Sequence, residues 1–173
     1  MNEAHHNAAW PPAIHEEAWL RARLPRDALA RRLAGIDPAL RLGETQAIGF
    51  PYLLCLYRWE VRRFGRRRQE WMSCLVDRCQ GVSTTFEGVE FGDPLAVADL
   101  PHAELETPPL ERKARQHVMQ VRRHRLKRRS ATGLELARCE TVRKPLWRVT
   151  AHHAQHGELA LLVDGLNGGY YLL

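Results

Sequence analysis

Arginine is concentrated in two short segments of this chain, and these are the segments best suited to bind an anion. One lies on both sides of Gly65, and the other spans residues 112–129. Each phosphate that a cation neutralises releases counterions, so such a segment would bind nucleic acid with a steep salt dependence. The candidate partner- or phosphate-binding residues are Arg66, Arg67, Arg68, Arg122, Arg123, Arg125, Lys127, Arg128 and Arg129.

The segment 112–129 is predicted to lie on a helix over residues 110–127. One narrow stripe of that helix is apolar and can dock on a sheet while the basic residues face water; it contains Leu110, Ala114, Val118 and Val121. Three interpretations stay open for the basic face: a phosphate-binding stripe, a surface for an acidic protein partner, and a solvated face in an arginine-biased chain.

The arginines around Gly65 are interleaved with aromatic residues. Trp59, Phe64 and Trp71 lie close to them in sequence. Basic and aromatic side chains together can bind and stack single-stranded bases. Strand alternation would bury Trp59 or Trp71 in a sheet equally well, so RNA contact and core packing are both retained as interpretations.

Two patterns look like metal sites and are predicted not to be. His152-His153-x-x-His156 lacks the glutamate of a His-Glu-x-x-His motif and falls at a strand end and turn, where helical zinc-site geometry is not available. Cys74 and Cys79 are separated by four residues and have no second pair with matching spacing. We therefore expect an exposed histidine turn, free thiols and no metal.

No residue pattern indicates catalysis. The chain contains no Gly-x-Ser-x-Gly elbow, phosphate-cradling glycine loop or dinucleotide fingerprint. Asp77 and Asp164 occupy equivalent places and are better explained by turn chemistry than by paired acid and base roles. We expect no enzyme activity, no catalytic residue and no cofactor.

The chain repeats itself. Leu40-x-Leu42-(x5)-Ile48-x-x-Pro51 recurs 94 residues later, from Leu134 to Pro145, and Leu75-Val76-Asp77-(x3)-Gly81 recurs 87 residues later, from Leu162 to Gly168. The repeat predicts an α+β fold in which two repeated units, each a helix followed by an antiparallel β-meander, form one pseudo-twofold domain.

Four regions are predicted along the chain. Residues 1–12 form a flexible tail, 13–87 the first helix-and-meander unit, 88–109 an acidic connector rich in proline and glycine, and 110–173 the second unit. The first helix is expected from Ile14 to Ile36, with a new segment or kink at Pro25. Strands are expected at 40–48, 52–61, 71–76 and 82–86 in the first unit, and at 134–142, 146–152, 158–163 and 170–173 in the second.

The C-terminal segment Leu162-Val163-Asp164-Gly165-Leu166-Asn167-Gly168-Gly169-Tyr170, preceded by Pro145-Leu146-Trp147-Arg148-Val149, resembles the final strand-turn-strand of PepSY-type domains. Similar residues occur at Pro51 to Leu54 and at Val76 to Gly81. PepSY-type domains pair a helix with antiparallel strands. The resemblance implies a binding or inhibitory module without catalytic residues of its own.

Composition and charge limit the class of protein. The chain has 173 residues, is 45% hydrophobic and carries a net charge of +6, so it can bury a core without disulfides. No segment approaches the roughly twenty apolar residues that span a bilayer, and the first thirty residues lack the apolar core of a signal peptide. We expect a cytoplasmic, non-enzymatic accessory or adaptor protein that binds a protein partner through its sheet or charged surfaces. The alternative is a small basic RNA- or DNA-binding protein that uses helix 112–129.

Overall fold

The computed structural model describes residues 18–63, 65–126 and 131–173. The elements in chain order are β1 (Ala18–Leu20), the 3-10 turn η1 (Arg26–Ala28), α1 (Leu29–Ile36), β2 (Leu40–Arg63), β3 (Arg66–Asp77), β4 (Ser83–Phe86), β5 (Phe91–Gly92), α2 (Thr107–Leu126), β6 (Ala131–His153), β7 (Gly157–Asp164) and β8 (Tyr170–Leu172). The predicted tail 1–12 lies outside the described residues.

The predicted fold class is wrong. The structure is mostly strand, 52% against 20% helix, and the strands form one eight-stranded sheet with the order β4-β3-β2-β6-β1-β5, extended by β7 beside β6 and β8 beside β7. The chain does not form two consecutive helix-and-meander units. The physical reason is that β2 and β6 are 24 and 23 residues long and are shared by both compact units.

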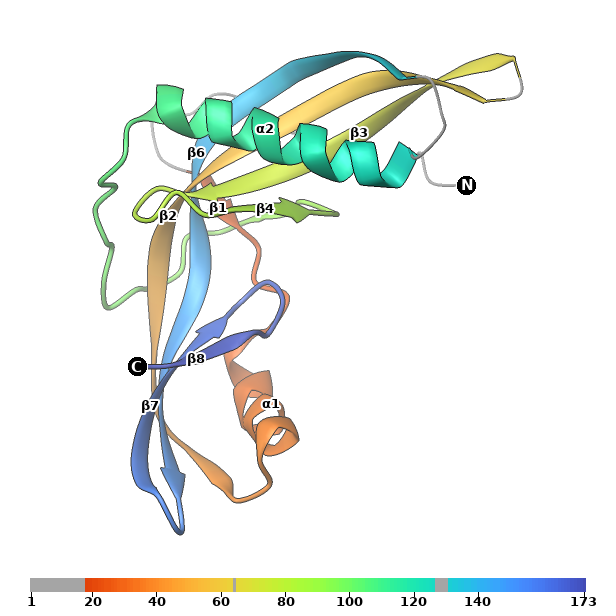
Figure 1. The fold of residues 1–173 in the computed structure, drawn as a ribbon. Helices are drawn as coiled ribbons and strands as arrows, with labels where there is room; N and C mark the ends of the chain where they lie inside the picture. Colours follow the sequence, from red (N-terminus) through yellow and green to blue (C-terminus); the bar gives the residue numbers. More distant parts are fainter. Residues whose placement is uncertain (1–17, 64, 127–130) are drawn as a thin grey trace. The chain divides into compact units, whose positions relative to one another are not determined.

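The described residues of unit 1 lie in two stretches of the chain, 51–90 and 102–142. It contains the second part of β2, with β3, β4, α2 and the first part of β6. β2 and β3 pair antiparallel from Tyr52 and Asp77 to Arg63 and Arg66, and Gly65 in the connecting turn has a φ of 76°. α2 lies across this part of the sheet (Figure 1) and packs on it through Leu110, Ala114 and Val118, as the apolar stripe predicts.

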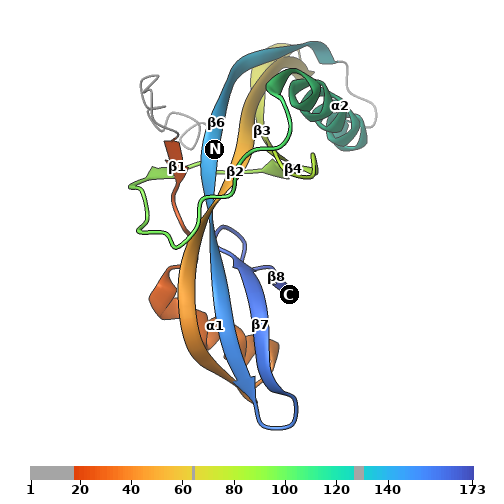
Figure 2. The same cartoon turned by 90° about the vertical axis from the view of Figure 1, so that its left-hand side faces the viewer.

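Unit 2 contains residues 16–50, 91–101 and 143–173. Leu29 and Leu33 of α1 are fully buried and pack with residues of β6 and β7, including Val149 and Val163. Figure 2 shows α1, β7 and β8 beside the shared strands. This second cluster is separate from the one beneath α2, so each unit has its own core.

Three local predictions differ from the structure for identifiable reasons. Pro51 and Pro145 do not end a strand, because β2 and β6 continue through them as parts of one extended sheet. Ala18–Leu20 is the strand β1 rather than a helix, because Trp19 and Leu20 are buried where β1 pairs with β5. α2 begins at Thr107, so Pro108 and Pro109 lie in its first turn, where a proline costs no hydrogen bond.

The two repeated turns are equivalent in detail. In the first, Asp77 Oδ1 accepts the amides of Cys79 and Gln80 at 2.7 and 3.1 Å, and Gly81 N donates to Asp77 O. In the second, Asp164 Oδ1 accepts the amides of Leu166 and Asn167 at 2.8 and 3.4 Å, and Gly168 N donates to Asp164 O. The φ angles of Gly81 and Gly168 are 70° and 69°. Aspartate and glycine thus have the turn roles that the repeat predicts.

Replacing Gly168 with valine is expected to lower the free energy of unfolding by about 1 kcal/mol or more. A β-branched residue is strained at a φ of 69°, and a Cβ there would lie 3.1 Å from Arg32 Nε, which donates to Gly168 O at 2.7 Å. Urea denaturation measures the change. Gly35→Ala, which has open space around its new Cβ, is the control and should not destabilise; equal stability of Gly168→Val and wild type would contradict the turn argument.

Candidate functional site

The predicted basic residues that the structure describes belong to unit 1, where they lie on α2 and on the hairpin of β2 and β3. Arg66, Arg67 and Arg68 begin β3 and are exposed, as are Arg123 and Arg125 in the last turns of α2. Lys127, Arg128 and Arg129 lie outside the described residues. Six of the nine predicted residues are therefore described, and they form two groups on one unit, one on β3 and one on α2.

Strand alternation divides the hairpin arginines between two faces. Val61 is directly opposite Arg68, and Arg62 is directly opposite Arg67. Opposite residues of an antiparallel pair point to the same face, so Arg68 and Arg66 share the face that carries Val61 and α2. Arg67 lies on the other face, where its Nε is 3.6 Å from Glu60 Oε1.

Arg122 connects α2 to the hairpin. Its guanidinium lies over the ring of Trp59, 5.6 Å from the ring centroid, in cation–π geometry. Partial burial lowers the pKa of Arg122 below its usual value because desolvation disfavours the charged form. The sequence left two roles open for Trp59, RNA contact and core packing. Trp59 is only 4% exposed, so it packs in the core.

Acidic residues neutralise part of the basic surface. Arg125 Nη2 is 3.1 Å from Oε1 of Glu87, the residue immediately before the region predicted as an acidic connector. Arg58 donates to both carboxylate oxygens of Glu135, at 2.9 and 2.7 Å, which holds the pKa of Glu135 below its usual range. Within the described part of the chain, Arg66, Arg68 and Arg123 form no ion pair. Among the predicted binding residues that the structure describes, these three guanidinium groups are exposed and available to an external anion.

The C-terminal strand β8 is a second candidate surface, one that sequence reasoning missed. Tyr170, Tyr171 and Leu172 are 47%, 68% and 66% exposed, and the following Leu173 is 62% exposed. β8 pairs with β7 on one edge, through Val163 and Tyr170, Leu162 and Tyr171, and Leu161 and Leu172. The sequence did carry a signal for this surface, because residues 170–173 are all apolar. A strand with only one buried face would alternate apolar and polar residues.

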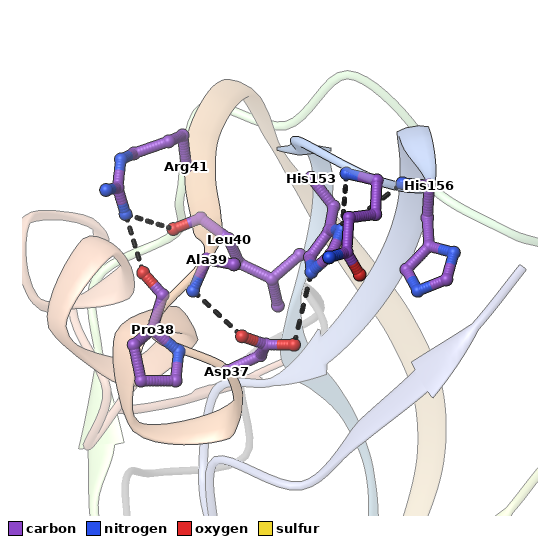
Figure 3. A network of polar contacts seen from close by, with 8 residues as sticks. Asp37, Pro38, Ala39, Leu40, Arg41, His153 and His156 are labelled. Atoms are coloured by element: carbon purple, nitrogen blue, oxygen red, sulfur yellow. Dashed lines mark hydrogen bonds and ion pairs between the residues drawn. The ribbon is translucent and has the colours of Figure 1, made fainter.

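The histidine turn is held by hydrogen bonds (Figure 3). His153 is buried, and its Nδ1 accepts the amides of Gln155 and His156 at 3.0 and 3.2 Å. Its Nε2 is 3.4 Å from Asp37 Oδ2. The rings of His153 and His156 are stacked, with 4.6 Å between their centroids. His152 and His156 are exposed as expected, whereas His153 is buried. No group of metal-ligating side chains is found within residues 18–63, 65–126 and 131–173.

A buried ion pair in unit 2 is a further polar feature that the sequence did not indicate. Lys144 Nζ lies 2.6 Å from Asp164 Oδ2, and both side chains are 9% exposed. The repeat offset of 94 residues places Phe50 where the second copy has Lys144. The second turn therefore has an ion pair that the first turn lacks. We interpret this ion pair as a structural contact of the turn.

Among the described helices, neither is long and apolar enough to cross a membrane. Comparison of the chain with protein-family models, with curated proteins and with solved structures returned no match.

Proposed function

We propose that this protein is a non-enzymatic accessory protein that binds an extended segment of a protein partner along β8. The observation that carries the proposal is the exposure of a whole strand of large apolar side chains, Tyr170 to Leu172, at an edge of the sheet. Strand edges normally avoid such residues, because unpaired backbone groups beside apolar side chains invite association. Contiguous exposed apolar surface is typical of binding sites.

The hydrogen bonds of β8 define which backbone groups a partner would meet. Leu173 N donates to Ala160 O at 2.9 Å, and Leu161 is opposite Leu172. In an antiparallel ladder, hydrogen-bonded and non-hydrogen-bonded pairs alternate, so Tyr171 bonds toward β7 while the N–H and C=O groups of Tyr170 and Leu172 point to the open edge. An added strand would take its main-chain hydrogen bonds from Tyr170 and Leu172 and its side-chain contacts from both faces.

Leu172→Pro is expected to weaken partner binding at least tenfold. Proline removes the outward N–H of residue 172 without removing a bond to β7. The partner is first identified by photo-crosslinking from position 171 in cells of the native host, then purified and titrated by calorimetry. Leu172→Ala, which keeps the N–H, is the matched control and should bind more tightly than Leu172→Pro.

Equal affinity of Leu172→Pro and wild type for the identified partner would contradict the proposal. A concentration-dependent dimer in sedimentation velocity, lost in Leu172→Pro, would also contradict it, since β8 would then pair with a second copy. Loss of the folded state is monitored by circular dichroism of each variant.

The exposed arginines support a second candidate function, the binding of RNA or DNA. Arg66, Arg68 and Arg123 are exposed and free of ion pairs with the described residues, while Arg122 holds α2 against the hairpin. If these three contact phosphates, the triple variant R66Q/R68Q/R123Q is expected to reduce the slope of log K against log salt by about 2 to 3, at roughly 0.7–0.9 per contact.

Fluorescence anisotropy with a labelled single-stranded oligonucleotide, at several salt concentrations, measures this slope. The control R26Q/R31Q/R148Q removes the same charge from exposed arginines of unit 2 and should leave the slope nearly unchanged. Equal slopes for the two triple variants would assign any binding to net charge rather than to this surface.

A further inference from the structure

Three cysteines lie in a row across adjacent strands beneath α2. Cys139 is on β6, Cys55 on β2 and Cys74 on β3, and β2 lies between the other two strands. Cys55 is directly opposite Cys74 in the β2–β3 register. Cys55 and Cys74 belong to the apolar cluster of unit 1, Cys139 packs against it, and all three are free thiols.

Cys55 contacts one of its two neighbours through sulfur. The Sγ atoms of Cys55 and Cys139 are 2.7 Å apart and share a hydrogen bond, although the residues are 84 positions apart in sequence. The Sγ of Cys74, by contrast, lies 4.0 Å from the carbonyl oxygen of Leu75. The strand pairing thus brings Cys139 and Cys55 to a distance from which a disulfide requires only a small movement.

The two thiols of this pair differ in their access to solvent. Cys55 is fully buried, whereas Cys139 is half-buried at the border of the cluster. The hydrogen bond to Cys139 and burial both raise the pKa of Cys55, and burial raises the pKa of Cys74 to about 12. Cys55 and Cys74 are therefore protonated at neutral pH and react slowly with an external oxidant.

We infer that Cys55 and Cys139 form a site of reversible oxidation by a hydroperoxide. In the first step the Cys139 sulfur attacks hydrogen peroxide, the O–O bond breaks, and Cys139 becomes a sulfenic acid with release of one water molecule. In the second step the Cys55 sulfur attacks the Cys139 sulfur, and the S–O bond breaks. The hydroxide leaves with the Cys55 proton as a second water molecule. A dithiol reductant restores both thiols by exchange.

The disulfide would join β2 to β6 beneath α2 and constrain a long loop of the unfolded chain. Cross-linking residues that are far apart in sequence stabilises a protein mainly by limiting its unfolded state. The oxidised protein is expected to melt several degrees above the reduced protein, and dithiothreitol should reverse the difference.

The test treats the full chain with a small excess of hydrogen peroxide at pH 7, removes the peroxide with catalase and alkylates the unfolded protein with N-ethylmaleimide. Mass spectrometry is expected to show two alkylated cysteines instead of four, with a reducible peptide pair that contains Cys55 and Cys139. Cys74→Ser, which keeps the pair, should give the same cross-link, and Cys139→Ser should lose it.

Four alkylated cysteines after peroxide, or a cross-link that joins any other two cysteines, would overturn the inference. The wild-type peptide map decides between these outcomes by itself, so the inference stays falsifiable even where a serine variant fails to fold. An oxidised protein with the melting temperature of the reduced one would overturn the proposed stabilisation.

Discussion

Asp164→Ala is expected to lower the free energy of unfolding by about 3–5 kcal/mol, because it removes one partner of a buried ion pair. Asp164 Oδ2 lies 2.6 Å from Lys144 Nζ, and Oδ1 accepts the amide of Leu166 at 2.8 Å. The substitution removes the carboxylate that faces the buried ammonium group and also leaves the turn amides without their acceptor. Urea denaturation at pH 7 measures the loss.

Two variants separate the ion pair from the turn. Asp77→Ala removes the equivalent turn acceptor in the first copy of the repeat, which has Phe50 in place of Lys144, and should cost about 1–2 kcal/mol. Asp164→Asn keeps an oxygen for the turn amides but loses the charge. A loss for Asp164→Ala no larger than that for Asp77→Ala would mean that the ion pair does not stabilise the fold.

Val118→Asp is expected to destabilise the protein by more than about 4 kcal/mol, with loss of the packing between α2 and its sheet. Val118 is fully buried in the apolar cluster between α2 and the sheet. A carboxylate at this position would be buried without a partner. Thermal melting and the near-ultraviolet circular dichroism of the tryptophans measure the effect.

Met119→Asp is the matched control for this substitution, because Met119 is the next residue of the same helix and is 43% exposed. Its stability should stay within about 0.5 kcal/mol of wild type. Similar destabilisation by both variants would show that negative charge on this helix, rather than loss of packing, causes the effect.

Features that depend only on residues close together in the sequence could be predicted from the sequence. The apolar stripe of α2, the hairpin at Gly65 and the paired turns at Asp77 and Asp164 all follow from residues at most eleven positions apart. Their backbone angles and helical spacing are set by local sterics and periodicity, which the amino-acid sequence expresses directly. The same is true of the basic segments, since charge clustered on one helix is visible without its surroundings.

Three features required the tertiary structure: the sharing of β2 and β6 by both units, the edge position of β8 and the proximity of the Cys55 and Cys139 thiols. The sequence predicts separate strands at 40–48 and 52–61, yet β2 continues through Pro51 because pairing with other segments stabilises the extended chain. Similarly, nothing near Cys55 in sequence predicts Cys139, 84 residues away. The sequence by itself determined the turns, the docked helix and the distribution of charge. Which strands pair, which thiols meet and which edge stays exposed depended on contacts between distant segments, whose free energy no local pattern contains.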